Sequence, residues 1–487
     1  MTMDEGITTV NKNVTTESLT MHALPNELLV IILTCVYHGN LCEPLAGNLT
    51  DRGNCAKVSG TLMLVCSRWR EIVMKIPRFW SHIDLLTHEL NNPIHLANVQ
   101  KHLALTKQVP VEIHIMDKLE PSAPLELENF CKIINEAAPR MRSLIFHQVN
   151  YSMDRSQDVL YHCLDHNTPG TLEELTIVLD DGSEDFRLFI EAEDSITRHS
   201  HPPIILKNMT VDRLEAALLS IVTLRLCGAF PYWVSKAYHG LVELCLHSKP
   251  NNSVPLEISH SSLLRILSLS PKLQVLDLDI KFTAIAEGFI ESVYLEDLRI
   301  LRTGLMSLHQ FKHFVEYLFP GPSPLTMCYR AYDGNSVASI TEITAFFSRA
   351  KVERTWLRSS HPYMDPRGLG ILKLAPHTRE LALSQLPFYN MHARIQADPG
   401  DYQYHIDTLY LLPPCKISIS NLEQITKSFR IQKVRIHHAC LVLEDDKLIP
   451  ASTLQERMSS ICKAIEWSDE YKPHGWGIPS FPATTRG

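Results

Sequence analysis

Histidine and cysteine are the residues of this sequence that could hold a metal ion or act as a nucleophile. The chain contains 24 histidines and twelve cysteines. The closest histidine pairs are His199-x-His201 and His437-His438, and neither has a Cys-x-x-Cys pair or a carboxylate at metal-ligand spacing. Zinc sites combine such partners at short, fixed spacings. We therefore expect these histidines to be ordinary strand or surface residues, and we expect no metal or cofactor.

Catalytic motifs are missing as well. The sequence contains no GxxxxGK(S/T) phosphate loop, no HExxH zinc motif and no GxSxG nucleophile turn. Gly368-Leu369-Gly370 begins a dinucleotide-binding pattern, but the third glycine does not follow. Cys66 lies on the apolar side of an expected helix, where nothing would lower its thiol pKa. We therefore expect a protein that is not an enzyme.

One short apolar pattern recurs through most of the chain. It reads apolar-x-x-apolar-x-apolar, as in Leu273-x-x-Leu276-x-Leu278, and it starts eleven times between residues 141 and 431. Apolar helical patterns, such as residues 310–318, lie between the copies. The copies are spaced by about 29 residues, which is typical of the strand, turn and helix of a leucine-rich repeat.

This spacing predicts an α/β fold in which short strands stack into one curved parallel sheet, as in a leucine-rich-repeat solenoid. A doubly wound α/β domain also alternates strands and helices, but its strands are buried on both faces and read as continuous apolar runs. The asparagine or cysteine that usually follows the last leucine is missing; the corresponding residues include Val149, Asp180 and Ala229. We therefore expect an irregular, leucine-rich-repeat-like solenoid.

The fifth residue of each expected strand should point away from the helices, toward the concave face of the sheet. The side chains at this position that suit binding are Arg225, Arg299, Tyr329, Trp356, Tyr410 and Arg435. Aromatic residues and arginines are common at binding hot spots, so we predict a target-binding surface here. The arginines would also suit a phosphate group. The alternative is that capping loops or the C-terminal tail cover these side chains.

The most apolar helical pattern of the chain lies near its N-terminus. Pro25 and Glu27 suit the first turn of a helix. The apolar residues that follow form one stripe, namely Leu24, Leu28, Ile31, Ile32 and Cys35. A second helical pattern begins at Leu62 and runs to Val73. Such short helices cannot enclose this much apolar surface, so either the rest of the chain or a second protein must cover it.

This stretch resembles the F-box, in the form common in fungal F-box proteins. The sub-motifs Leu-Pro-x-Glu-Leu, Val-Cys-x-x-Trp-Arg and Pro-x-Phe-Trp-x-x-Ile-Asp-Leu follow one another within residues 24–85, with an inserted loop at residues 37–57. The resemblance implies that these helices bind a Skp-family adaptor and, through it, a cullin. The residues that would contact the adaptor are Leu24, Pro25, Glu27, Leu28, Ile31, Ile32, Val65, Cys66 and Trp69.

We divide the chain into a disordered tail (1–20), an F-box-like helical domain (21–86), a leucine-rich-repeat-like solenoid (87–468) and a C-terminal tail (469–487). The net charge of −8 argues against nucleic-acid binding. We find neither a secretory signal nor a membrane-length apolar run. The scattered cysteines indicate free thiols in a reducing compartment, which predicts a cytoplasmic or nuclear protein.

Three functional hypotheses follow from these patterns. In the first, the chain is the substrate-recognition subunit of an SCF-type (cullin-RING) E3 ubiquitin ligase, and its repeat region binds a target protein while other subunits perform the catalysis. In the second, it is a repeat scaffold for protein–protein interaction without a role in ubiquitination, and its N-terminal helices only cap the solenoid. The third, an α/β enzyme, lacks a glycine-rich loop and an acid–base pair.

Overall fold

A computed structural model describes most of the chain. The described residues are 24–39, 55–118, 125–149, 152–179, 188–195, 203–248, 257–283, 291–306, 308–331, 341–359, 375–388, 405–445, 447–470, 473 and 476. The expected disordered tail, 1–20, lies outside them, as does most of the expected loop 37–57. The described ends of that loop, residues 37–39 and 55–57, are helical.

Helices form the N-terminal part of the molecule. They are α1 (Asn26–Gly39), α2 (Cys55–Val65), α3 (Ser67–Lys75) and the short 3₁₀ helix η2 (Pro77–Trp80). The expected second helix is therefore two helices, separated by Cys66, whose Sγ accepts the backbone N–H of Trp69 at 3.5 Å. Leu29, Leu33 and Trp80 belong to the buried core between these helices.

A single large sheet of 16 strands follows these helices. Its main path is β1 (His82–Leu86), β2 (Val111–Asp117), β3 (Met141–Gln148), β4 (Glu174–Leu179), β7 (Thr223–Cys227), β9 (Glu243–His247), β11 (Val275–Asp279), β14 (Ile300–Met306), β16 (Leu325–Ala331), β17 (Val352–Ser359), β18 (Glu380–Phe388), β19 (Thr408–Ser418), β20 (Lys433–His437) and β23 (Ala464–Ser468). Neighbours on this path are parallel. β21 (Leu441–Glu444) joins β19, and β22 (Lys447–Leu448) pairs antiparallel with β21.

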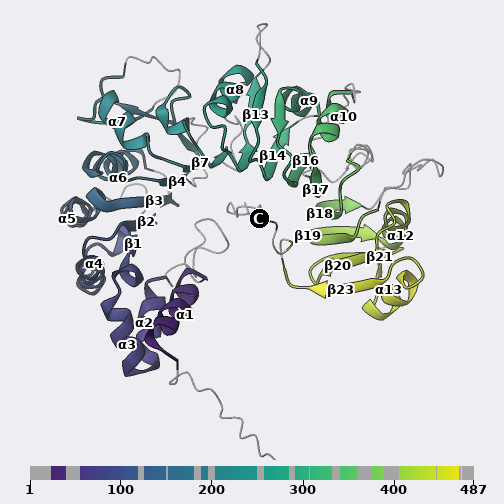
Figure 1. Ribbon diagram of the computed structural model, residues 1–487, viewed down its shortest axis with the longest axis horizontal. Helices are drawn as coiled ribbons and strands as arrows, with labels where there is room; N and C mark the ends of the chain where they lie inside the picture. The colour runs from purple at the N-terminus through teal and green to yellow at the C-terminus, as the bar shows by residue number, and fades with distance from the viewer. Residues whose placement is uncertain are drawn as a thin grey trace, which may run out of the picture.

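Helices lie along the outside of this sheet, which curves into an arc with its strands on the inner side (Figure 1). These helices are α4 (Pro93–Thr106), α5 (Leu127–Ala137), α6 (Met153–His166), α7 (Val211–Leu218), α8 (His260–Ser268), α9 (Leu308–Glu316), α10 (Thr341–Arg349), α12 (Ile419–Ser428) and α13 (Ala451–Met458). Three small sheets lie beside the large one: β6-β5-β8 (Ile204–Leu206, Leu188–Ala192, Ala229–Pro231), β10-β12 (Glu257–Ser259, Lys281–Thr283) and β13-β15 (Val293–Leu295, Leu318–Pro320).

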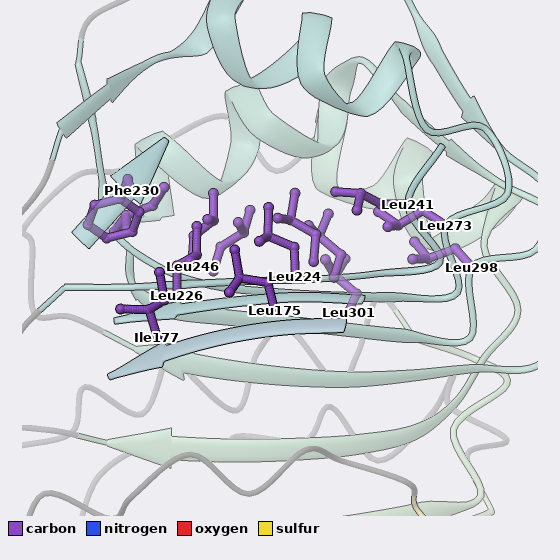
Figure 2. Packing of buried hydrophobic residues seen from close by; sticks show 14 of the residues in the cluster. Leu175, Ile177, Leu224, Leu226, Phe230, Leu241, Leu246, Leu273, Leu298 and Leu301 are labelled. Carbon is purple, nitrogen blue, oxygen red and sulfur yellow. The ribbon is translucent and has the colours of Figure 1, made fainter. Parts of the chain in front are cut away.

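The recurring leucines form the core between the sheet and the helices. Leu175 pairs laterally with Leu224, Leu224 with Leu244, and Leu244 with Leu276, so identical positions of successive strands stack in rows. Figure 2 shows Leu175, Leu224 and their neighbours projecting from the same side of the sheet. Because side chains alternate along a strand, the residues between these leucines point to the opposite, concave face.

The α/β class and the large parallel sheet are thus confirmed. The strands follow one another across the sheet in chain order, whereas a doubly wound sheet reverses its order at a switch point. One boundary differs from the prediction, because β1 lies within the expected helical domain (21–86) yet is the first strand of the large sheet. The N-terminal helices are therefore joined to the sheet without a separating linker.

Candidate functional site

An exposed apolar surface covers one side of the N-terminal helices. Helix α1 turns Leu29, Leu33 and Tyr37 inward, where they are 0–3% exposed. Its other side is open to solvent. The exposed apolar residues are Leu28 (47%), Ile31 (58%), Ile32 (36%) and Val36 (40%) on α1, with Leu64 (80%) and Val65 (58%) at the end of α2. We call these six residues the N-terminal apolar face.

Arg68 holds the two parts of this face together. Its Nε donates to Asn26 Oδ1 at 2.9 Å and its Nη2 donates to the backbone oxygen of Leu24 at 2.5 Å. These bonds fix the junction of α2 and α3, which includes Val65 and Cys66, beside the first turn of α1. The six apolar side chains lie on the two helices that Arg68 joins, and the described residues of the molecule leave them open to solvent.

The nine predicted adaptor-binding residues fall into two groups. Pro25, Glu27, Leu28, Ile31, Ile32 and Val65 are exposed, and Leu24, Cys66 and Trp69 are half-buried. Leu24 and Trp69 pack against the small helical core from its edge. None of the nine is sealed beneath the sheet. The cover that we expected for this surface does not come from the described part of the chain.

The helices also close the first end of the sheet. Trp80 is 2% exposed and packs edge-on against the His102 ring of α4, with ring centroids 4.9 Å apart. Its Nε1 donates to the backbone oxygen of Val73 at 2.9 Å. Trp80 therefore joins the N-terminal helices to α4, the first helix beside the sheet.

One lateral row of side chains crosses the concave face of the sheet. The pairing of successive strands places in this row Asp84, His114, Ile145, Thr176, Arg225, Cys245, Asp277, Arg302, Cys328, Trp356, Ala382, Tyr410, Arg435 and Glu466. We call it the central row. Four of the six predicted concave-face residues belong to it, namely Arg225, Trp356, Tyr410 and Arg435.

Arg299 and Tyr329 do not belong to the central row, so their predicted positions are wrong. Leu298 and Leu301 point to the core, and Arg299 lies before β14. The residue of β14 that occupies the central row is Arg302, which pairs with Asp277. In β16, Leu325, Met327 and Tyr329 belong to the core, and Cys328 pairs laterally with Arg302, so the strand is one residue out of step with the expected pattern. Tyr329 therefore faces the helices, where it is 3% exposed and packs on Phe311 at 4.9 Å between ring centroids. A shift of one residue moves a side chain to the other face.

The arginines of the central row are engaged within the chain. Arg225 donates from Nε and Nη2 to the two carboxylate oxygens of Glu243, at 2.6 and 2.8 Å. Arg435 Nε donates to Glu466 Oε2 at 2.9 Å. These pairs neutralise the positive charge that a phosphate group would need, so the structure does not favour phosphate recognition at these two arginines.

The most buried charge of the row is Asp277, which is 0% exposed. Arg302 Nη1 lies 3.0 Å from its Oδ2, and His247 Nε2 lies 3.0 Å from its Oδ1. Burial alone would raise the pKa of this carboxyl group, but the charges of Arg302 and His247 outweigh burial and lower it. Asp277 therefore stays ionised inside the protein.

Trp476, in the C-terminal tail, packs against part of the central row. It is 2% exposed and packs with Ile300, Ala382, Tyr410 and Leu412. The sequence analysis left open that the C-terminal tail covers concave-face side chains, and Trp476 makes such a contact with Tyr410. A large aromatic residue in an otherwise polar, proline-rich tail was the signal for this contact.

Hydrogen bonds fix the aromatic residues of this contact. Trp476 Nε1 donates to Glu380 Oε2 at 2.7 Å, and the Tyr410 hydroxyl lies 3.5 Å from the same oxygen. Trp356 Nε1 donates to Ser384 Oγ at 2.8 Å. We call the surface around Trp476, formed by Ile300, Ala382, Tyr410 and Leu412, the Trp476 slot.

A third group of polar residues lies at the other end of the central row and was missed by the sequence analysis. His82 and Asp84 on β1 adjoin Glu112 and His114 on β2. Burial lowers the pKa of His82, but its interactions with the carboxylates of Asp84 and Glu112 outweigh burial and raise the pKa to about 9. Burial would raise the pKa of Asp84, but hydrogen bonds from His114 and His82 lower it. The alternation along Val111–Ile115 already placed Glu112 and His114 on the same face of an expected strand. It could not show that this face adjoins His82 and Asp84.

Comparison with known proteins adds no family to these observations, since no protein-family model and no curated protein sequence matches this chain. Among the helices in the described ranges, none combines the length and the apolar character that crossing a membrane requires.

Proposed function

We propose that this chain is the substrate-recognition subunit of an SCF-type (cullin-RING) E3 ubiquitin ligase. In this proposal the N-terminal helices are an F-box that binds a Skp-family adaptor and, through it, a cullin. The large sheet with its outer helices is a leucine-rich-repeat-like solenoid that binds a target protein. Both partners and the enzymes of ubiquitin transfer meet in the cytoplasm or the nucleus, where we place this protein.

The N-terminal apolar face is the observation that carries the proposal. Single exposed apolar residues are common on protein surfaces, but a cluster on two neighbouring helices marks an interaction site. The cluster includes Leu28, Ile31, Ile32 and Val65, which are positions of the F-box resemblance. Burying one such side chain is worth about 1.5–3 kcal/mol, so several together support a stable complex.

The concave face supports the second half of the proposal. It carries Trp356 beside charged residues, a composition that favours protein binding, while Tyr410 lies beneath Trp476. The Trp476 slot already accepts an aromatic side chain of the tail, which demonstrates that this part of the face can bury one. The chain needs no nucleophile for this function, because its contribution is to hold a target close to the transferring enzyme.

A repeat scaffold with a simple N-terminal cap is the competing function. The contact of Trp80 with His102 on α4 is compatible with a cap. A cap, however, requires apolar residues only on the side that faces the sheet, and Ile31 and Leu64 are exposed. Removing residues 1–86 is a poor test of the two functions, because it also removes β1 and exposes the edge of β2.

The sharper test is a surface substitution, Ile31→Glu, measured against a purified Skp-family adaptor. The matched control is Ile94→Glu on α4, where the isoleucine is 72% exposed but lies outside the N-terminal apolar face. Losing one buried apolar contact should weaken adaptor binding about 10–100-fold in I31E. I94E should bind like the unmodified chain. Both variants should keep its melting temperature, because both side chains are exposed.

Two results would count against the proposal. One is adaptor binding by I31E that equals that of I94E and of the unmodified chain. The other is an unmodified, folded chain that binds no Skp-family adaptor at all. Either result leaves the scaffold as the better account, because a scaffold needs the helices only for closing the sheet.

A further inference from the structure

Two histidines and an aspartate converge where the first two strands meet. In the register of β1 and β2, Asp84 is the lateral partner of His114, and His82 is the partner of Glu112. Asp84 Oδ1 lies 3.2 Å from His82 Nε2 and 3.2 Å from His114 Nδ1. The His82 and His114 side chains are 5% and 2% exposed. The cluster is therefore built into the sheet and is nearly sealed from water.

Hydrogen bonding inside the cluster leaves part of it unsatisfied. Both imidazoles are directed at the same oxygen, Asp84 Oδ1, while the second oxygen of that carboxylate, Oδ2, is buried without a hydrogen-bond partner. His114 Nε2 is also buried without one. Buried polar atoms are normally paired, so the unpaired second oxygen of a carboxylate that two imidazoles contact indicates a missing partner of positive charge.

We propose that His82, Asp84 and His114 bind a divalent transition-metal ion, with zinc as the preferred ion. One ligand atom from each residue lies within 4.8 Å of the others. Zinc binds imidazole nitrogen and carboxylate oxygen at about 2.0–2.2 Å, which in a tetrahedral site separates neighbouring ligand atoms by about 3.3 Å. The nitrogen–oxygen distances of 3.2 Å in the cluster match that separation.

Glu112 completes the arrangement from the second strand. Its Oε2 lies 3.5 Å from Nδ1 of His82, the ring nitrogen that faces away from Asp84. Histidines that bind a metal through one nitrogen usually donate the other N–H to a carboxylate or a carbonyl, which fixes the tautomer and the orientation of the ring. Glu112 lies near enough to His82 for this role, although His82 Nδ1 makes no hydrogen bond in the structure. Three protein ligands leave the fourth position of a zinc ion for water.

Bound at this position, the ion links β1 to β2 at the end of the sheet that carries the N-terminal helices. Metal that binds only the folded chain stabilises it by mass action. The site does not depend on the proposed ubiquitin-ligase function, because its ligands lie on the sheet and not on the N-terminal apolar face. A failure of one proposal therefore leaves the other intact.

The test is metal titration of the full chain after treatment with a chelator. We expect one equivalent of Co²⁺ to give the visible absorption bands of a tetrahedral site without thiolate charge-transfer bands, and Zn²⁺ to displace it. Zn²⁺ should also raise the melting temperature. H114A and D84N should lose the cobalt bands, and E112Q should bind zinc about 10–100-fold more weakly.

The matched control is H405A. His405 Nε2 lies 3.2 Å from Asp407 Oδ1, the same distance and sequence spacing as in the His82–Asp84 pair, but both side chains are more than half exposed. H405A should bind like the unmodified chain. D84N keeps the size of the side chain, so it remains informative if H114A does not fold.

Three outcomes would overturn the metal site. They are a folded, unmodified chain that binds no zinc, cobalt bands that show thiolate ligands, and a folded D84N that retains full affinity. The first outcome would make the cluster a purely structural network of hydrogen bonds. The second would move metal binding to the cysteines.

Discussion

At the scale of single residues, Asp277 shows how the concave face tolerates buried charge. A buried carboxylate is costly unless opposite charges and hydrogen bonds compensate it. Here Arg302 and His247 flank Asp277 at 3.0 Å from opposite oxygens. The three residues come from three neighbouring strands, β9, β11 and β14. One carboxylate on β11 therefore forms ion pairs with the strands on both of its sides.

Asp277→Asn should therefore be strongly destabilising. Breaking a buried ion pair costs about 3–5 kcal/mol, because the partner charge is left without compensation. We expect urea denaturation at neutral pH to give a loss of that order in the free energy of unfolding. The control is Glu71→Gln, which removes an exposed pair with Lys75 and should change the unfolding midpoint little.

The same variant predicts a pH dependence with a definite sign. The pKa of Asp277 lies below its ordinary value of 3.8 in the folded chain. Its ionised form therefore stabilises the protein above about pH 4, and this contribution disappears as the pH falls through the lowered folded pKa. The difference in melting temperature between the unmodified chain and D277N should shrink on acidification below pH 4. A constant difference would contradict this account.

At the scale of elements, Trp476 of the tail packs on the strands β18 and β19. Trp476 contributes an aromatic contact to Tyr410, at 5.9 Å between ring centroids, and a hydrogen bond to Glu380. Residues at the end of a chain detach easily unless such contacts hold them. Trp476 is thus the anchor of the tail, and it occupies surface that the proposed function assigns to the target.

Trp476→Ala should release this anchor. We expect faster proteolysis beyond Glu470 and faster amide exchange in β18 and β19, both measured by mass spectrometry. The control is Trp467→Ala, because Trp467 is 37% exposed on β23 and stacks only on a surface histidine, His438. Equal effects of the two substitutions would show that Trp476 has no special role in holding the tail.

At the scale of the whole molecule, the order of the strands determines how stability is distributed. Each strand of the main path pairs with the path strands before and after it, and β19 pairs with β21 as well. Stability in such an array is a sum of local terms, and regions far apart can open independently. The last strand, β23, has one neighbour and no fully buried residue, whereas β11 lies mid-sheet with three.

Leu454→Ala in α13 should destabilise the C-terminal strands and leave the N-terminal strands unchanged. The substitution removes a side chain that is 1% exposed, at a cost of about 2–5 kcal/mol. We expect faster amide exchange in β20 and β23 and unchanged exchange in β2, β3 and β4. Faster exchange in all strands alike would mean that the whole molecule unfolds as one unit.

Periodicity alone was enough to predict the α/β class, the parallel sheet and most of the core. The leucines of each repeat are spaced as a strand requires, and burial of one strand face is a local property of the pattern. The apolar stripe of α1 was predicted in the same way. The sequence could not tell which side of this helix the chain itself would cover, because Leu29 and Leu33 are as apolar as Ile31 and Ile32.

The sequence by itself thus determined which segments form strands and helices, because the alternation of apolar residues acts within a few neighbouring positions. Only the tertiary structure decided which side chains meet across strands. The shifts that moved Arg299 and Tyr329 out of the central row, the placement of Trp476 on the concave face and the meeting of Asp84 with His114 all depend on lateral register. Register is set by packing between distant segments, and a one-residue change in it turns a side chain to the opposite face.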